Sequence, residues 1–265
     1  MNWNREKLVS LARYTRTLAQ MTAGPMDLSV RWMNNKKGYP PMWLRQKVGD
    51  LNDFEGSGGE YIAYLKLLCN LKRGDTLLDL GCGCGLVCLQ INENASIPEY
   101  LGSDGRYVGL DIDKKLVDWC DRNIKRRYPN CQFTTSLDGL YNYKFDVVLA
   151  KSLFTHLYLE EAERYFKEIS RLLRPNGKCL ATFFLRRESD RLTGRYTFRF
   201  PSINGHVLYE RGSNPTLAVA YDAELFPGLV KLSGLQIEEV HYGSWRGDGK
   251  GLSFQDIVIL RGLHR

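Results

Sequence analysis

The feature that most constrains this chain is an apolar run that passes through an acid into a glycine-rich loop, Leu77-Leu78-Asp79-Leu80-Gly81-Cys82-Gly83-Cys84-Gly85. The apolar residues predict a buried strand. Glycine at every second position permits positive φ angles and lets a ligand approach the backbone closely. Residues 86–91 resemble the start of a helix. A strand, a bare loop and a helix in this order predict a site for a nucleotide-like cofactor.

A second apolar segment supplies an acid for the same site. Residues 107–110 predict a strand that ends in Asp111-Ile112-Asp113, about 20 to 30 residues after the first, where such folds place the carboxylate that holds a ribose. The dinucleotide fingerprint Gly-x-Gly-x-x-Gly does not fit, because its third glycine would fall on Leu86 or Cys88. A hydride-transferring dehydrogenase is therefore the weaker interpretation.

The pattern Asp-x-Gly-x-Gly-x-Gly resembles the first motif of class I S-adenosylmethionine-dependent methyltransferases. In that family the loop approaches the methionine moiety, so the resemblance implies S-adenosylmethionine as cofactor. Asp111 matches the acid that binds both ribose hydroxyls, and Ile112 matches an apolar wall of the adenine slot. The resemblance also assigns the cofactor to Asp79, Gly81, Cys82, Gly83 and Gly85.

Later segments are similar to the second half of the same family core. They include residues 145–148, 154–157 and 168–178, where Asn176 replaces the middle glycine of the usual Pro-Gly-Gly turn. A narrower resemblance, to a group of bacterial methyltransferases of the small-molecule or saccharide type, covers nearly the whole chain. It rests on the Pro-Pro-x-x-Leu-Arg lead-in that ends at Arg45, and on residues 119–120, 154–157, 182–185, 242–245 and 255–257.

Strands and helices alternate from residue 76 onward, which predicts an α/β fold. We expect a Rossmann-like, seven-stranded, mostly parallel sheet with helices on both faces and an antiparallel edge hairpin. The expected strands are 76–80, 107–111, 131–135, 145–150, 178–185, 236–242 and 254–260. The expected helices are 60–71, 114–128, 160–173 and 222–232, with a turn at 174–177 in which glycine takes the left-handed position.

The domain organisation follows from the same pattern. Residues 1–59 are expected to form a helical and loop-rich extension over the cofactor site, with an amphipathic helix at 4–22. Residues 60–265 are expected to form the methyltransferase domain. Within it, residues 186–233 interrupt the alternation of strands and helices, and they are predicted to be a substrate lid.

Composition narrows the class of protein. The net charge of +7 is compatible with nucleic acid, an anionic membrane or an acidic substrate, but the basic residues fall in short groups without an aromatic-rich nucleic-acid motif. No run of about 18 apolar residues and no signal peptide is evident, so we expect a cytoplasmic protein without a transmembrane segment. The seven cysteines lack paired metal-ligand spacing, which predicts buried thiols and no metal.

Methyl transfer needs an in-line nucleophile, exclusion of water and, for some acceptors, a base. Lys151, Phe154, Thr155 and His156 follow the fourth strand and are expected to lie beneath the methyl group. His156 is the candidate base, since imidazole titrates near pH 6.5 when unperturbed. The alternative is that its ring only bonds a neighbouring loop.

Two further residues are assigned to the cofactor with open alternatives. Asp138 matches the acid beside the adenine amino group, with Ser136 or Leu137 as the other choices for that lining position. Arg45 is a candidate clamp for the methionine carboxylate, and a structural salt bridge is the alternative.

The acceptor is predicted from residues 186–211, where six arginines alternate with aromatic residues. Arginine suits phosphate or carboxylate and aromatic rings stack on rings or sugars, which predicts an anionic or glycosylated small acceptor. The substrate residues are then Phe154, Thr155, Phe184, Arg186 and Tyr209, and the alternative is a solvated surface hairpin. We expect transfer to oxygen, with nitrogen second. An RNA methyltransferase and a non-catalytic binder of the cofactor are the rival functions.

Overall fold

The computed structural model describes residues 24–34, 36, 38–48, 56–92, 95–190, 192–193, 196–202, 205–210, 214–247 and 249–263. The chain divides into two compact units, Met1–Ser57 and Gly58–Arg265. In the first unit residues 24–33 are helical, and a short helix α2 spans Met42–Arg45. The amphipathic helix expected at 4–22 lies outside the described residues.

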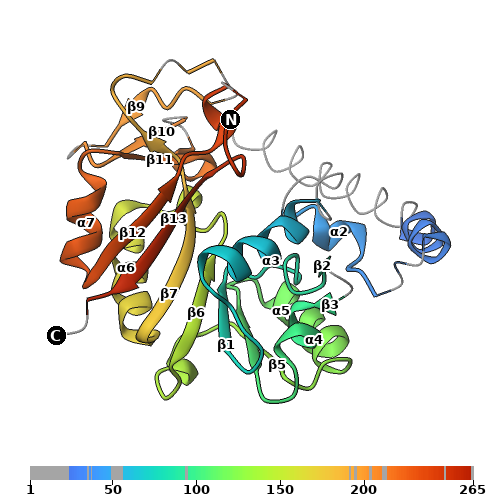
Figure 1. The fold of residues 1–265 in the computed structure, drawn as a ribbon. Coiled ribbons are helices and arrows are strands. Elements are labelled where there is room, and N and C mark those ends of the chain that lie inside the picture. The colour runs from blue at the N-terminus through green and yellow to red at the C-terminus, as the bar shows by residue number, and fades with distance from the viewer. Residues whose placement is uncertain are drawn as a thin grey trace, which may run out of the picture. The chain divides into compact units, whose positions relative to one another are not determined.

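A seven-stranded sheet in the order β12-β13-β7-β6-β1-β4-β5 forms the centre of the second unit (Figure 1). Its first five strands in the chain are parallel, whereas β13 runs antiparallel to both β7 and β12. The predicted α/β sheet and its antiparallel edge hairpin are therefore confirmed. The strands are β1 (Thr76–Leu80), β4 (Arg106–Leu110), β5 (Cys131–Thr134), β6 (Phe145–Ala150), β7 (Leu173–Phe183), β12 (Leu235–His241) and β13 (Asp256–Gly262).

The direction of chain travel places helices on both faces of this sheet. From β1 the chain moves outward through α4 (Ile97–Leu101) to β4, and then through α5 (Lys114–Cys120) to β5. From β6 it moves the opposite way, through α6 (Leu159–Leu172) to β7. Because such crossovers are right-handed, α6 lies on the face opposite α4 and α5. The strand order reverses between β1 and β6, and open α/β sheets bind ligands beyond the carboxyl ends of strands at such a point.

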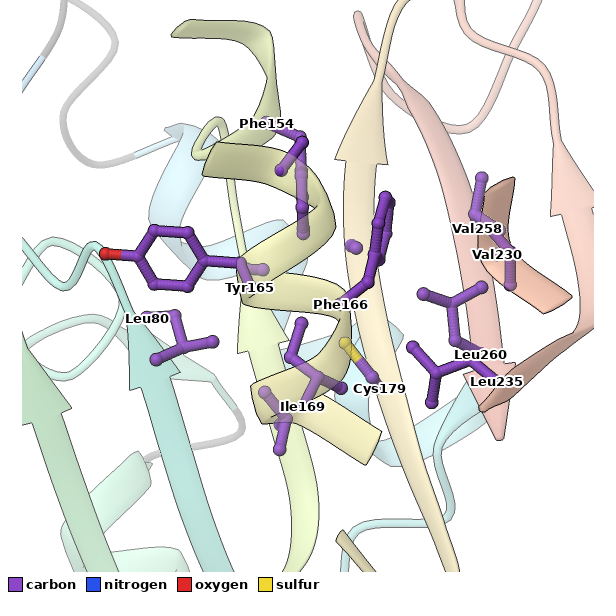
Figure 2. Packing of buried hydrophobic residues seen from close by; sticks show 14 of the residues in the cluster. Leu80, Phe154, Tyr165, Phe166, Ile169, Cys179, Val230, Leu235, Val258 and Leu260 are labelled. Carbon is purple, nitrogen blue, oxygen red and sulfur yellow. The ribbon is translucent and has the colours of Figure 1, made fainter. Parts of the chain in front are cut away.

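The largest core cluster lies between the sheet and helices α6 and α7 (Phe226–Leu232) (Figure 2). Phe166 of α6 is fully buried, and its ring stacks on that of Phe154 with 4.5 Å between centroids. Phe154 also stacks on Phe183 of β7, at 4.9 Å. Burying a large aromatic side chain contributes about 2–3 kcal/mol, so this cluster holds the ends of β6 and β7 in place.

The other helices differ in length from expectation. Helix α3 spans Gly56–Leu68, so it begins four residues before the predicted helix and ends three residues before its predicted end. The predicted helix 114–128 is α5 followed by one π-helical stretch, η2 (Asp121–Lys125).

The helix predicted to begin at residue 86 is absent; that prediction is wrong. Residues 83–89 form turns, followed by a short hairpin of β2 (Ile91–Asn92) and β3 (Ala95–Ser96). Gly81, Gly83 and Gly85 take φ angles of 78°, 57° and 79°. A right-handed helix cannot include residues with left-handed φ angles, so the backbone is non-helical through Gly85, and the pairing of Ile91–Asn92 with Ala95–Ser96 ends the turns that follow.

The turn before the fifth core strand is also different from the prediction. The residue in the left-handed region is Asn176, with φ of 66°, not the glycine that follows it. Gly177 is required for another reason, because a Cβ atom there would lie 2.9 Å from the carbonyl oxygen of Phe145. Residues 174–177 thus continue into β7, which starts at Leu173 rather than at the predicted Lys178.

The predicted insertion contains a second, smaller sheet in the order β8-β11-β10-β9 (Figure 1). The predicted helix 222–232 is shorter, because residues 219–222 pair as strand β11 before α7 begins at Phe226. Within the described part of the chain, no helix has the length and apolar character needed to cross a bilayer. The small strands are β8 (Leu185–Arg186), β9 (Phe200–Pro201), β10 (Val207–Tyr209) and β11 (Val219–Asp222).

Candidate functional site

The glycine loop is tied to the end of the neighbouring strand by backbone hydrogen bonds. The N–H groups of Gly81 and Cys82 donate to the carbonyl oxygen of Leu110, at 2.8 and 3.0 Å. The next glycine, Gly83, donates its N–H to Oδ2 of Asp111 at 2.9 Å. The two segments that the sequence pattern singled out therefore meet at the carboxyl ends of β1 and β4.

Asp111 is held rigidly and still has capacity to accept. Its Oδ1 accepts from the N–H of Asp113 at 2.9 Å, so each carboxylate oxygen is anchored by one backbone donor. A carboxylate has about four lone-pair positions, which leaves one on each oxygen for a hydroxyl group. The adjacent Ile112 is 84% exposed, an unusual position for an isoleucine. An anchored acid beside an exposed apolar side chain suits a ribose joined to a flat base.

Asp79 lies beneath the loop and is almost completely buried. Its Oδ2 accepts a hydrogen bond of 2.6 Å from the hydroxyl of Tyr107. Burial raises the pKa of Asp79 to about 6, with the Tyr107 hydrogen bond and the Lys151 cation acting in the opposite direction. The side chain of Asp79 is therefore bonded within the sheet, between β1 and β4.

The loop packs tightly on the strands behind it. A Cβ atom on Gly109 of β4 would lie 2.8 Å from the sulfur of Cys82 and from the ring of Phe133. The sequence analysis did not assign this glycine a role, although a glycine inside a strand often marks close approach of another segment. All seven cysteines are free and buried, and within the described ranges no three His, Cys, Asp or Glu residues are grouped to hold a metal ion.

The segment after β6 borders the glycine loop. A Cβ atom on Gly81 would lie 3.7 Å from Cδ1 of Leu153, so the two segments are in contact. Ser152, beside Leu153, takes a φ of 56°, which is uncommon for a residue with a side chain. The amino group of Lys151 lies 5.1 Å from the ring centre of Tyr61, which comes from α3. Tyr61 was missed by the sequence analysis, since nothing in its local pattern separates it from a core residue.

His156 is exposed and its ring is oriented by the insertion. Its Nδ1 lies 2.9 Å from the carbonyl oxygen of Thr216, in the 3₁₀ turn η5 (Pro215–Leu217). Because a carbonyl only accepts, Nδ1 carries the hydrogen and Nε2 of the neutral ring is a proton acceptor. His156 therefore makes the bond to a neighbouring loop that was the alternative to a catalytic role. In this arrangement its Nε2 still has a lone pair that can accept a proton.

Phe154 and Thr155 are placed in the interior. Phe154 belongs to the aromatic core stack described above and is among the core side chains drawn in Figure 2. Thr155 is also fully buried, and its hydroxyl donates to the carbonyl of Ser152 at 3.0 Å. The residue spacing alone did not reveal which side chains of this segment face inward.

Phe184, Arg186 and Tyr209 fall into three different environments. Phe184 is buried in an aromatic cluster with Phe198 and Trp245, both 5.2 Å away between centroids. Arg186 is half-buried and donates to the carbonyl of Arg187. Tyr209 is half-buried and meets the exposed ring of Tyr158 edge to face at 6.3 Å. Tyr209 is thus the member of this set that contributes to a partly exposed aromatic surface.

A buried ion network joins the insertion to β13, and the sequence analysis did not find it. The guanidinium of Arg246 binds Asp190 at 3.0 Å and Asp256 at 2.7 Å. Asp256 is fully buried and also accepts from the indole N–H of Trp245 and the N–H of Leu185, at 2.9 and 2.6 Å. These residues are far apart in the sequence, so their charges formed no local pattern.

The two remaining cofactor candidates lie in separate surroundings. Asp138 is exposed and begins a 3₁₀ turn, where its carboxylate accepts from the hydroxyl of Ser136 at 2.8 Å. Arg45, in the first unit, pairs with Asp27 at 2.5 Å and donates to the carbonyl of Pro40. The salt bridge raised as the alternative for Arg45 is therefore present.

Comparison with known proteins supports what the geometry indicates. A family model described as a methyltransferase domain matches residues 71–191. A demethylmenaquinone methyltransferase of Lactobacillus johnsonii is 25% identical over 181 residues, or 65% of this chain and 60% of that protein. A ribosomal protein L11 methyltransferase of Cupriavidus metallidurans is 28% identical over 130 residues, or 49% of this chain and 38% of that protein. The chain thus spans less than two thirds of either relative.

Solved structures share the fold at low sequence identity. An S-adenosylmethionine-dependent methyltransferase from Clostridium acetobutylicum matches with a TM-score of 0.52 and 14% identity, covering 82% of this chain and 94% of that one. The 1,6-didemethyltoxoflavin-N1-methyltransferase of Burkholderia thailandensis matches with a TM-score of 0.52 and 17% identity, covering 78% and 79%. Residues 71–191 therefore match a methyltransferase domain model, and the two solved structures show that methyltransferases share this fold.

Proposed function

We propose that this protein binds S-adenosylmethionine over its glycine loop and transfers the methyl group to an oxygen of a small molecule, including one that carries a sugar. Nitrogen is the second choice of acceptor atom. The observation that carries the proposal is the joint between the glycine loop and Asp111, formed at the switch point of a class I sheet.

The cofactor half of the proposal assigns roles to residues already in place. Asp111 would accept from the ribose hydroxyls, and Ile112 would lie against the adenine. Gly81 and Gly83 would let the methionine part approach the backbone, with Lys151 beside it. The sulfonium supplies the leaving group when it is bound, so these residues need only bind and orient it.

The acceptor half of the proposal rests on His156. The Thr216 carbonyl keeps the hydrogen of the neutral ring on Nδ1, so Nε2 carries no hydrogen and can accept one. A hydroxyl placed between Nε2 and the methyl group would lose its proton to the ring during transfer. Tyr158 and Tyr209 form an aromatic surface from the segment that follows His156 and from β10, which suits a ring or a sugar face.

The arginines from which an anionic acceptor was predicted have partners within the protein where the structure describes their ion pairs. Arg187 pairs with Asp190 at 2.8 Å, and Arg246 is enclosed by Asp190 and Asp256. Arg191, Arg195 and Arg211 lie outside the described residues. Arg187 and Arg246 therefore form ion pairs within the protein. The proposal for the acceptor rests mainly on the aromatic surface of Tyr158 and Tyr209.

Titration calorimetry with S-adenosylhomocysteine tests the cofactor half. The wild-type protein should bind with saturation, and Asp111→Ala should weaken binding at least tenfold, because two hydroxyl hydrogen bonds to a charged group are lost. Asp104→Ala, an exposed acid in the turn before β4, is the matched control and should bind like the wild type. Equal affinity of the Asp111→Ala variant would contradict the assigned role.

The two rival functions predict different results in binding and product assays on the same purified protein. A non-catalytic binder would bind S-adenosylhomocysteine and yield no methylated product with phenol, sugar or amine acceptors. An RNA methyltransferase would bind RNA with an affinity that falls steeply as salt is raised, and would methylate it.

A further inference from the structure

Three polar groups from distant parts of the second unit meet at the carboxyl ends of β6 and β7. The side-chain oxygen of Gln255 accepts from the hydroxyl of Thr182 at 2.6 Å and from that of Ser152 at 3.0 Å. The N–H of Ser152 donates in turn to the hydroxyl oxygen of Thr182 at 2.7 Å. Thr182 is fully buried and Gln255 is half-buried, so water competes little for these bonds.

The orientation of the Gln255 amide is set by its partners. The Thr182 hydroxyl oxygen accepts the Ser152 N–H, and the protons of both hydroxyls are donated to Gln255. The amide presents Oε1 to Ser152 and Thr182, an orientation in which both hydroxyl protons have an acceptor. A residue of the same shape without this oxygen would leave two hydroxyl donors without their acceptor.

The bonds hold Ser152 in a conformation that its own side chain disfavours. Its φ of 56° lies in the left-handed region, where a non-glycine residue persists only if its surroundings require it. Every polar atom of Ser152 is used: the N–H by Thr182, the hydroxyl by Gln255 and the carbonyl by the Thr155 hydroxyl.

The conformation of Ser152 affects the glycine loop through the next residue, Leu153. A Cβ atom at Gly81 would lie 3.7 Å from the side chain of Leu153, so the backbone angle at Ser152 decides how closely this segment approaches the loop. Lys151 and His156, which the proposed function places at the methyl group, lie on the same short segment.

We propose that Gln255 is a positioning residue of the cofactor site: its side-chain oxygen holds Ser152 in the left-handed conformation and thereby keeps residues 151–156 against the glycine loop. The inference rests on the proposed function, because it assumes that the loop binds the S-adenosyl group. It assigns Gln255 no contact with the reacting atoms.

Calorimetry with S-adenosylhomocysteine as the probe tests this on two variants. Gln255→Met keeps the length of the side chain and removes the oxygen, and it should weaken binding about tenfold, the effect of roughly one net hydrogen bond. Gln255→Glu retains an acceptor oxygen and should bind within about threefold of the wild type. Gln236→Met, on an exposed position of β12, is the matched control and should bind normally.

A coupling measurement separates positioning from general stability. If Thr182→Val and Gln255→Met act through the same contact, the double variant should lose little more affinity than Gln255→Met alone. Unchanged affinity of Gln255→Met, or a tenfold loss in Gln255→Glu, would overturn the proposal. A wild-type protein that fails to bind the probe would instead refute the proposed function, so the two failures are distinguishable.

Discussion

Two regions at the carboxyl end of the sheet are built in different ways. The cofactor region, residues 76–85 and 106–113, is positioned by backbone groups: Gly81, Cys82 and Gly83 donate their N–H groups to the end of β4. The proposed acceptor region, the described residues of 151–156, 182–222 and 243–256, is held by side chains that meet across long stretches of chain, such as Ser152 and Gln255. A site built from the backbone of consecutive residues can be recognised in the local sequence. A network of side chains from distant segments cannot.

The largest expected effect comes from breaking the side-chain network of the acceptor region. Arg246→Met would leave the buried carboxylate of Asp256 without its cation and Asp190 paired with Arg187 alone, which should cost about 3–5 kcal/mol in the free energy of unfolding. Urea denaturation measures it. Arg174→Met removes an exposed ion pair with Asp146 and should cost under about 1 kcal/mol. Equal losses in the two variants would contradict the contrast between buried and exposed pairs.

An intermediate effect is expected in the cofactor region, at Asp79. The folded-state pKa of Asp79 is raised to about 6 from 3.8, so the folded protein binds the proton more tightly than the unfolded chain. Its contribution to stability is therefore greatest below pH 3.8 and is lost as pH rises through about 6. Asp79→Asn keeps an acceptor for Tyr107 without the charge, and should stabilise the protein by about 1–2 kcal/mol at pH 8.

Thermal denaturation at two pH values checks the sign of this effect. The advantage of Asp79→Asn over the wild type at pH 8 should shrink at pH 4.5, where the wild-type carboxyl is protonated. Asp118→Asn, at an exposed i,i+4 pair with Lys114, serves as control and should show no such pH dependence. A variant less stable than the wild type at pH 8 would show that the Asp79 charge supports the loop.

The smallest effect on stability is expected at His156. Its ring is exposed, and His156→Gln retains a donor for the Thr216 carbonyl, so the free energy of unfolding should change by less than about 0.5 kcal/mol. Binding of S-adenosylhomocysteine should stay within twofold. Transfer to a hydroxyl acceptor that the wild type methylates should fall about 100-fold, since glutamine cannot take the proton. Wild-type transfer rates in this variant would assign His156 a structural role alone.

Much of the sheet could be predicted because buried parallel strands are continuous apolar runs. Strand β6 was predicted at its observed bounds, and the alternation of strands and helices predicted a mostly parallel sheet. The helix expected after Gly85 is absent, because residues 83–89 form turns and Ile91–Asn92 pair with Ala95–Ser96 in a hairpin that local sequence did not indicate. Phe154 and Thr155 were expected at the acceptor and lie in the interior, since position along a loop does not tell which way a side chain points.

The sequence by itself determined the cofactor region, because glycine conformational freedom and an acid at a strand end are properties of consecutive residues. Only the tertiary structure decided which side chains meet in the proposed acceptor region. The orientation of His156 by Thr216, the bridge of Gln255 to Ser152, and the pairing of Arg246 with two acids all depend on residues that are neighbours in space alone. Hydrogen bonds act over about 3 Å, so no spacing along the chain can stand in for that proximity.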